Sequence, residues 1–284
     1  MAHGPELLAV FYGFSSALVW GAADFSGGLA SKQARVVAVV FFSQIIGLIC
    51  MTGVALGTGE PIPSLKVLMM GGAAGFAGIL GLVAFYHSLA NGRMGFVAPL
   101  SAITAAILPI GWAAFTLGLP AVSPLMGLLV AMIAIWLLSA DSAAGEKSSN
   151  SLLLPILAGA GFGLFFIGIG EASKSAVFWP LVASKTVSIG VMAILMGLQK
   201  TPLPVTRATW SLIILAGVLD VAGNGLFALA AHIGRLDISA TLGSMYPAAT
   251  VLLAYFILKE PLRLHHWGGL GFALAALFLI SNPI

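Results

Sequence analysis

Charged residues are scarce in this chain: Asp, Glu, Lys and Arg make up 7% of 284 residues, whereas apolar residues make up 60%. A soluble domain carries about 25% charged residues, so a water-soluble globular protein is excluded. The mean hydropathy of +1.09 is typical of a protein that lies in a bilayer. The net charge is only +3, without a basic run or basic residues interleaved with aromatic ones. A nucleic-acid partner is therefore not expected.

Cysteine is nearly absent. Cys50 is the only one and lies in an apolar segment, which excludes an internal disulfide and a cysteine-rich metal site. His265 and His266 are adjacent, so they lack the i, i+4 spacing of a helical zinc site. We expect no metal and no other cofactor. Residues 1–6 lack the basic region and cleavage site of a signal peptide, so the first apolar segment is interpreted as a retained helix.

Long apolar segments are abundant, and a spanning helix needs about 20 such residues. Spanning β-strands would instead show alternating polarity in pieces of about ten residues. The segments are apolar throughout and are bounded by glycine, proline and charged residues, which predicts ten transmembrane helices. Their expected limits are Leu7–Leu29, Val36–Leu56, Leu65–Ala90, Phe96–Leu119, Ser123–Ala140, Leu152–Gly170, Val177–Leu198, Thr209–His232, Ile238–Leu258 and Trp267–Ile280.

An internal repeat organises the chain. Shifting the sequence by 142 residues, half of its 284, aligns Ala30–Lys32 with Ala172–Lys174 and Gly92–Arg93 with Gly234–Arg235. We therefore expect two five-helix repeats, 1–142 and 143–284. Because five is odd, the second repeat enters the membrane inverted relative to the first. The predicted fold is an all-α membrane protein with ten transmembrane helices, arranged as two inverted repeats around a central cavity, which is typical of secondary transporters.

Lys185 and Asp220 are the ionisable residues placed deepest in the predicted spans. A charge within a span costs about 2.5–3.5 kcal/mol on insertion scales, which makes each residue a functional candidate. Their depths in neighbouring antiparallel helices agree, so they can form an ion pair. The pair is either a site for substrate or a coupling proton, or a purely structural contact, and Lys185 can alternatively extend to the membrane interface.

Helix eight of the prediction presents Gly217, Asp220, Asn224 and Phe227 on one stripe. We expect this stripe to face the cavity and bind substrate. The alternative is a polar seam between helices, since asparagine also holds helices together in membranes.

The first helix carries a similar stripe of Ser16, Trp20 and Asp24. Trp20 and Asp24 are therefore candidate substrate-binding residues. Asp24 lies near the expected helix end, where hydration is the alternative, and a lone tryptophan also serves in packing or at the interface.

Two tyrosines complete the candidate site. Tyr86 lies in the last turns of the third helix, and Tyr246 precedes Pro247, where a bent helix can expose backbone carbonyls to a cavity. Aromatic walls suit an aromatic or apolar substrate. The alternative for both tyrosines is anchoring at the membrane interface.

Short motifs in consistent order resemble those of the drug/metabolite transporter superfamily, in particular its ten-helix EamA-type exporters. Leu18–Gly21 resembles a Trp-Gly element of the first helix, and Ala90–Gly95 resembles a short link of small residues. Ser244–Pro247 followed by Leu258–Leu262 resembles a proline-containing ninth helix with its glutamate cap. The corresponding Leu117–Pro120 of the first half lacks the glutamate.

The resemblance implies a secondary transporter in the bacterial inner membrane that exports or exchanges small metabolites, amino acids and aromatic ones included. A proton or a counter-substrate would drive it, and its partners would be a small molecule and membrane lipid. Nucleotide-sugar or multidrug cation transport is the alternative. The sequence has no motif of an intramembrane enzyme and no pore motif of a channel, so both are less favoured alternatives, and we do not expect an enzyme.

The orientation has two interpretations. By the positive-inside tendency, the surplus of Lys and Arg on the face opposite the termini places both termini outside. The resemblance implies that both are cytoplasmic.

Overall fold

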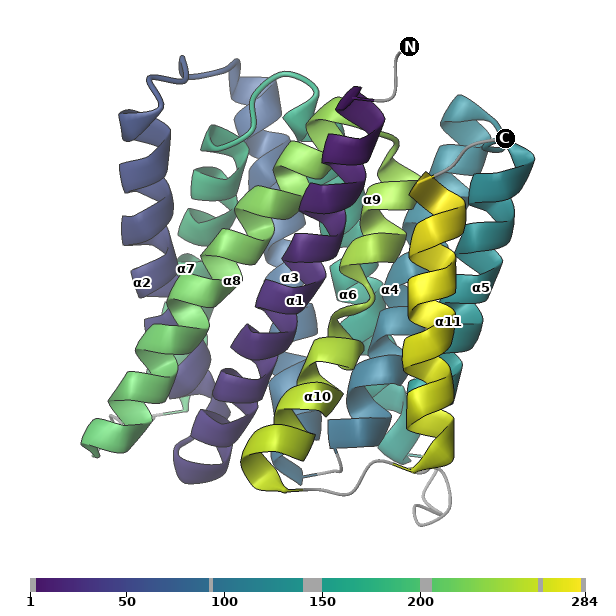
Figure 1. Ribbon diagram of the computed structural model, residues 1–284. Helices are drawn as coiled ribbons and strands as arrows, with labels where there is room; N and C mark the ends of the chain where they lie inside the picture. The colour runs from purple at the N-terminus through teal and green to yellow at the C-terminus, as the bar shows by residue number, and fades with distance from the viewer. Residues whose placement is uncertain (1–3, 92–93, 140–149, 200–205, 260–262, 282–284) are drawn as a thin grey trace.

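The computed structural model describes residues 4–91, 94–139, 150–199, 206–259 and 263–281, and within these ranges all regular secondary structure is helical. Figure 1 shows the helices as one bundle, in which α1 begins and α11 ends at the same edge. The elements are α1 (Gly4–Gln33), α2 (Val36–Gly57), α3 (Leu65–Asn91), α4 (Met94–Leu117), α5 (Val122–Ser139), α6 (Asn150–Ser173), α7 (Trp179–Leu198), α8 (Arg207–Ile233), α9 (Leu236–Gly243), α10 (Tyr246–Leu258) and α11 (Leu264–Ser281).

The ten-helix prediction is confirmed. Eight stretches in the described part of the chain are long and apolar enough to cross a membrane, and α5 and α11 are slightly shorter apolar helices. One of the eight stretches is divided: α9 and α10 together form the ninth span, with a break at Ser244 and Met245. Pro247 explains the position of the break, because it has no N–H to bond the carbonyl of Gly243, the last residue of α9.

Contacts between the two halves of the chain occur in matching pairs. Helix α1 packs along α8, and α6 packs along α3. Helix α4 packs on α6, while α9 and α10 pack on α1. Helices α2 and α7 contact each other, and α5 contacts α11 at one side of the bundle (Figure 1). Each contact is thus repeated between the corresponding helices of the other half.

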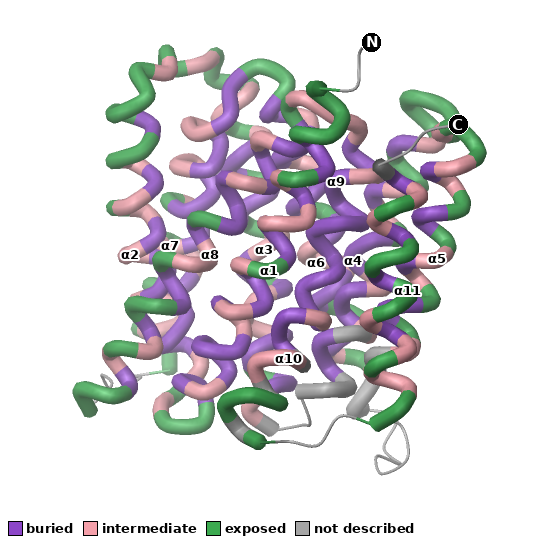
Figure 2. Tube along the Cα trace, in the orientation of Figure 1, coloured by how far each residue is buried: buried purple, intermediate pink, exposed green. Residues whose placement is uncertain are grey.

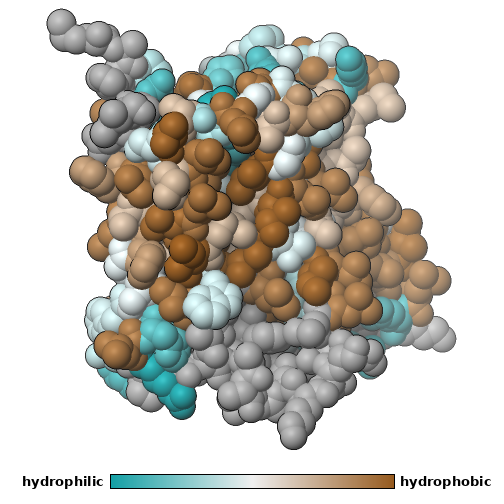
Figure 3. Space-filling model, turned by 90° about the vertical axis from the view of Figure 1, so that its right-hand side faces the viewer, coloured by the Kyte–Doolittle hydropathy of each residue, from teal (hydrophilic) through white to brown (hydrophobic). Residues whose placement is uncertain are grey.

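The surface of the bundle is apolar around its middle. Figure 2 shows buried residues on the inner sides of the helices and exposed ones on the outer sides. Figure 3 shows a hydrophobic band between more hydrophilic ends on the side of α5 and α11. Leu129, Trp136 and Leu274 are exposed there. Large apolar side chains on an outer surface of this kind are solvated by lipid tails.

The loop between α2 and α3 caps the start of α7. Glu60 accepts hydrogen bonds from the backbone N–H groups of Val177 at 2.6 Å, Phe178 at 2.9 Å and Trp179 at 3.0 Å. The indole Nε1 of Trp179 also donates to the carbonyl oxygen of Glu60 at 2.7 Å. A carboxylate at a helix N-terminus satisfies N–H groups that have no partner within the helix, and it interacts favourably with the helix dipole. This contact joins the first half of the chain to the second.

Replacing Glu60 with Ala is expected to lower the free energy of unfolding by about 1–2 kcal/mol, because three N–H groups lose their acceptor. Denaturation of the purified protein in detergent measures the effect. Glu6→Ala is the control: Glu6 is exposed in the first turn of α1, so only a weak interaction with the helix dipole is lost and the effect should be smaller. Equal stability of the two variants would show that the cap contributes nothing.

Candidate functional site

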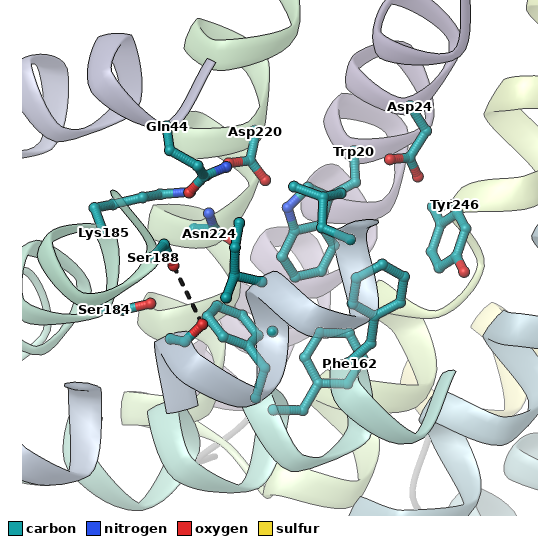
Figure 4. Close-up of a pocket in the computed structure, with 16 residues that line it drawn as sticks. Trp20, Asp24, Gln44, Phe162, Ser184, Lys185, Ser188, Asp220, Asn224 and Tyr246 are labelled. Carbon is teal, nitrogen blue, oxygen red and sulfur yellow. Dashed lines mark hydrogen bonds and ion pairs between the residues drawn. The ribbon is translucent and has the colours of Figure 1, made fainter. Parts of the chain in front are cut away.

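A cavity lies in the middle of the bundle, between helices of both halves. Asp220, the central residue of α8, lies at its wall. The space between the lining atoms, open mouth included, amounts to about 580 Å³. Its lining comprises Trp20, Asp24, Gln44, Gly75, Gly78, Ile79, Leu82, Phe162, Phe165, Phe166, Ser184, Lys185, Ser188, Asp220, Asn224 and Tyr246 (Figure 4).

One wall carries the ion pair that was predicted between α7 and α8. The ammonium of Lys185 donates to Oδ2 of Asp220 and, at 2.9 Å, to Oε1 of Gln44. Only 5% of the Lys185 side chain and 18% of the Asp220 side chain are exposed. Partial burial removes both charges from water, so each depends on the other for compensation. The pairing is confirmed, whereas a role in substrate binding stays a prediction.

Gln44 of α2 is the residue that sequence reasoning missed. Its amide nitrogen donates to Oδ2 of Asp220 at 3.5 Å, and its amide oxygen accepts from Lys185, so it bridges the two charges. Three residues further along α2, Gly47 lies beside the lysine side chain: a Cβ at that position would be 3.4 Å from the lysine Cε, an ordinary van der Waals contact. The sequence indicates this residue only as the single amide side chain in the apolar segment Val36–Leu56. A search for ionisable residues does not detect an amide.

Trp20 and Asp24 of α1 lie on a second part of the wall. The ring of Trp20 stacks on Phe166 with 5.5 Å between the ring centroids. Glycines at positions 223 and 243 make room for the indole, since a Cβ at either would lie within about 3.0 Å of it. Asp24 is half-buried, and its carboxylate contacts the cavity. It has no hydrogen bond or ion pair with any other residue that the structure describes.

Tyr246 lies at the start of α10, directly after the break in the ninth span. Its hydroxyl is 2.6 Å from Oγ of Ser101 and donates to the carbonyl of Ala98 at 3.3 Å, both in α4. These contacts fix the tyrosine ring where it lines the cavity. The helix break therefore places an aromatic side chain that is tied to both halves of the chain.

Two of the eight candidate residues, Tyr86 and Phe227, are not among the residues that line the cavity. Phe227 is fully buried, with its ring centroid 4.7 Å from that of Phe166 and 5.7 Å from that of Trp20. Tyr86 packs directly against Gly27 of α1. Of the predicted stripe on α8, only Asp220 and Asn224 therefore reach the cavity, because aromatic neighbours cover Phe227.

Residues on the charged side of the cavity correspond, in the internal repeat, to apolar residues on its opposite side. Phenylalanines of α6 and aliphatic side chains of α3 face the cavity opposite the charged residues. The same shift of 142 residues that aligns the two halves pairs Trp20 with Phe162, Asp24 with Phe166, Asp220 with Gly78 and Asn224 with Leu82. All eight are lining residues, so matched positions of the two halves form the cavity with different chemistry.

The arrangement suits binding of a small organic molecule with one polar end and one apolar end. Among the residues described, no group of three or more His, Cys, Asp or Glu side chains converges as metal ligands do.

Comparisons with known proteins agree with this architecture. Residues 149–282 match the model of the EamA-like transporter family. A solved structure described as "Crystal structure of protein" aligns with 95% of this chain and 95% of its own, with a TM-score of 0.75 and 15% sequence identity. At that identity the likeness concerns the fold. No curated protein sequence matches the chain.

Proposed function

Because residues 149–282 match the EamA-like transporter family and the helices are long and apolar enough to cross a membrane, we propose that the chain is a multi-pass membrane transporter that moves small metabolites by a secondary, alternating-access mechanism. Its substrates are amino acids, aromatic ones included, or related amino compounds. No phosphate-binding loop is present in the sequence, so an ion gradient or a counter-substrate drives transport. Export from the cytoplasm of a bacterial cell, across its inner membrane, is the proposed direction.

One observation carries the proposal. The cavity at the centre of the bundle combines charged groups from α1, α7 and α8 with three phenylalanines from α6. Charges within a membrane are costly and mark the paths of polar substrates. A ligand with an amino group and an apolar body matches both walls.

The mechanism follows from the proposed repeats, 1–142 and 143–284. Helices that correspond in the two halves make matching contacts, which supports a duplication with inverted topology. Two related halves of opposite orientation can adopt each other's conformation, which exposes a site at their interface to one side of the membrane and then to the other.

Counterflow in proteoliposomes tests the proposal. Purified protein is reconstituted and preloaded, and uptake is measured with radiolabelled amino acids, amines, nucleotide sugars and organic cations. We expect saturable exchange of at least one amino compound. Asp220→Asn and Trp20→Ala should each reduce that exchange about tenfold or more. Each variant removes a side chain that contacts the ligand or that holds a ligand-contacting residue in place.

Trp136→Ala is the matched control for Trp20→Ala, because Trp136 is exposed on α5 at the lipid-facing surface. It should leave exchange unchanged. Size-exclusion chromatography establishes that all variants are folded. If folded wild-type protein exchanges no member of the panel, metabolite transport through this cavity is refuted.

A further inference from the structure

Asp24 is a carboxylate without a partner at the wall of a cavity inside the membrane. It lies one helical turn after Trp20, on the same face of α1, and contacts the cavity. Within the described ranges, neither a hydrogen bond nor an ion pair compensates its charge. Because an uncompensated charge within a span costs about 2.5–3.5 kcal/mol, a cation bound beside Asp24 would relieve an unfavourable state of the empty protein.

The charges that line the cavity do not balance. Asp24 and Asp220 are acidic, and Lys185 is the only basic residue among the lining residues described. Its ammonium already donates to Asp220 and Gln44. With both carboxylates ionised, the cavity carries one excess negative charge, and its one basic side chain is already paired. An anionic group of a ligand would have to share Lys185 with Asp220 or rely on neutral donors.

Aromatic side chains lie on two sides of Asp24. In Figure 4, Asp24 lies between Trp20 and Tyr246, on the side of the cavity away from Lys185. Tryptophan and tyrosine faces attract ammonium groups, tryptophan most strongly. The hydrogen bonds of Tyr246 to α4 hold its ring in place. A cation at Asp24 would thus meet a carboxylate and two oriented rings.

The rest of the lining determines the other end of the ligand. Phe162, Phe165 and Phe166 of α6 form an apolar wall next to Trp20. Such a wall accepts an aromatic or aliphatic body and cannot satisfy a second charged group. The cavity is therefore suited to a molecule that is cationic at one end and apolar at the other.

We infer that Asp24 binds the ammonium group of the substrate, and that the preferred substrates are primary amines with an aromatic or apolar body and no carboxylate. The inference rests on the proposed function and narrows its substrate class. Amino acids are weaker ligands of this cavity, because their carboxylate would lie near two acidic residues without a free base.

Three probes with the same phenyl ring separate the possibilities: phenethylamine is a cation, phenylalanine a zwitterion and 3-phenylpropionate an anion. Binding is measured by the thermal shift of the purified protein, and transport by inhibition of counterflow. We expect phenethylamine to bind about tenfold or more tightly than phenylalanine, because phenylalanine has a carboxylate that the cavity must accommodate and phenethylamine has none. 3-Phenylpropionate should not bind.

Asp24→Asn should weaken phenethylamine binding about 10- to 100-fold, because the charge-assisted contact is lost while the size of the side chain is kept. Glu6→Gln is the matched control: it makes the same carboxylate-to-amide change at an exposed position of α1 and should leave binding unchanged. Since Asp24 has no partner among the described residues, its replacement should not impair folding, which the unliganded melting temperature checks.

Two outcomes would overturn the inference alone: phenylalanine binding as tightly as phenethylamine, or Asp24→Asn binding the amine as wild type does. In either case exchange of amino compounds would persist, and the proposed function would stand. If folded wild-type protein exchanges neither these probes nor any member of the wider panel, both the inference and the proposed function are refuted.

Discussion

Lys185→Met is expected to lower the free energy of unfolding by about 3–5 kcal/mol, because Asp220 would keep its charge inside the bundle without the ammonium that compensates it. Only 18% of the Asp220 side chain is exposed, so little water is available to replace the lysine. Gln44 can still donate to Asp220, but a single amide at 3.5 Å is a weak substitute for an ammonium. Denaturation of the purified protein in detergent measures the loss.

Lys174→Met provides the control. Lys174 pairs with Glu171 near the end of α6, and 52% of its side chain is exposed. Exposed ion pairs contribute about 0–1 kcal/mol, so this variant should be close to wild type. Equal losses in the two lysine variants would contradict the argument that burial makes the inner pair important.

A triple variant separates a structural pair from a functional one. Lys185→Met, Asp220→Leu and Gln44→Leu together remove both charges and the amide between them, leaving no polar group of this cluster unpartnered. Replacing a buried ion pair with apolar residues is often neutral for stability or favourable. Stability should therefore recover, whereas counterflow should remain lost. Recovery of both would assign the pair to structure alone.

The sequence predicted the helices well because membrane insertion depends on local composition. Apolar segments of about 20 residues between Gly, Pro and charged residues can only be spanning helices. The nine continuous helices agree with the expected limits to within a few residues. The break in the ninth span could be predicted from the sequence only in part. Pro247 indicated a bend, but the gap at Ser244 and Met245 follows from the backbone geometry before the proline.

The candidate site was predicted in part. Charged residues within spans are expensive, so Lys185, Asp220 and Asp24 could be recognised individually, and all three line the cavity. The position of Phe227 could not be derived, because a helical stripe defines which residues share a face and not which neighbours cover them. Phe166, which covers Phe227, lies in another helix, and nothing local in the sequence indicates that contact.

Gly75→Val is the second change for which we expect a large effect. A Cβ at Gly75 would overlap the backbone of Ser184, since α3 and α7 approach each other at this point without an intervening side chain. Small residues allow such approaches between helices in membranes, where packing replaces the hydrophobic effect as the source of association. The hydroxyl of Ser188 also donates to the carbonyl of Gly75 at 3.2 Å. Both contacts hold α7 against α3.

The expected loss of stability is about 1–3 kcal/mol, which is the usual cost of overpacking. Transport should be lost as well, because the segment of α7 that would be displaced carries Ser184, Lys185 and Ser188 of the cavity wall. Gly190→Val, in α7, is the control: position 190 is exposed, and a Cβ there has no neighbour within 4 Å.

The control also accounts for the change in helix propensity from glycine to valine, which both variants share. Gly217→Val tests the corresponding contact of the other half, where a Cβ would lie 2.6 Å from the carbonyl oxygen of Ser43 in α2. A similar loss is expected there, because Gly217 approaches α2 next to Gln44 as Gly75 approaches α7 next to Lys185. If Gly75→Val and Gly190→Val behaved alike, close approach of α3 and α7 would not be what positions Lys185.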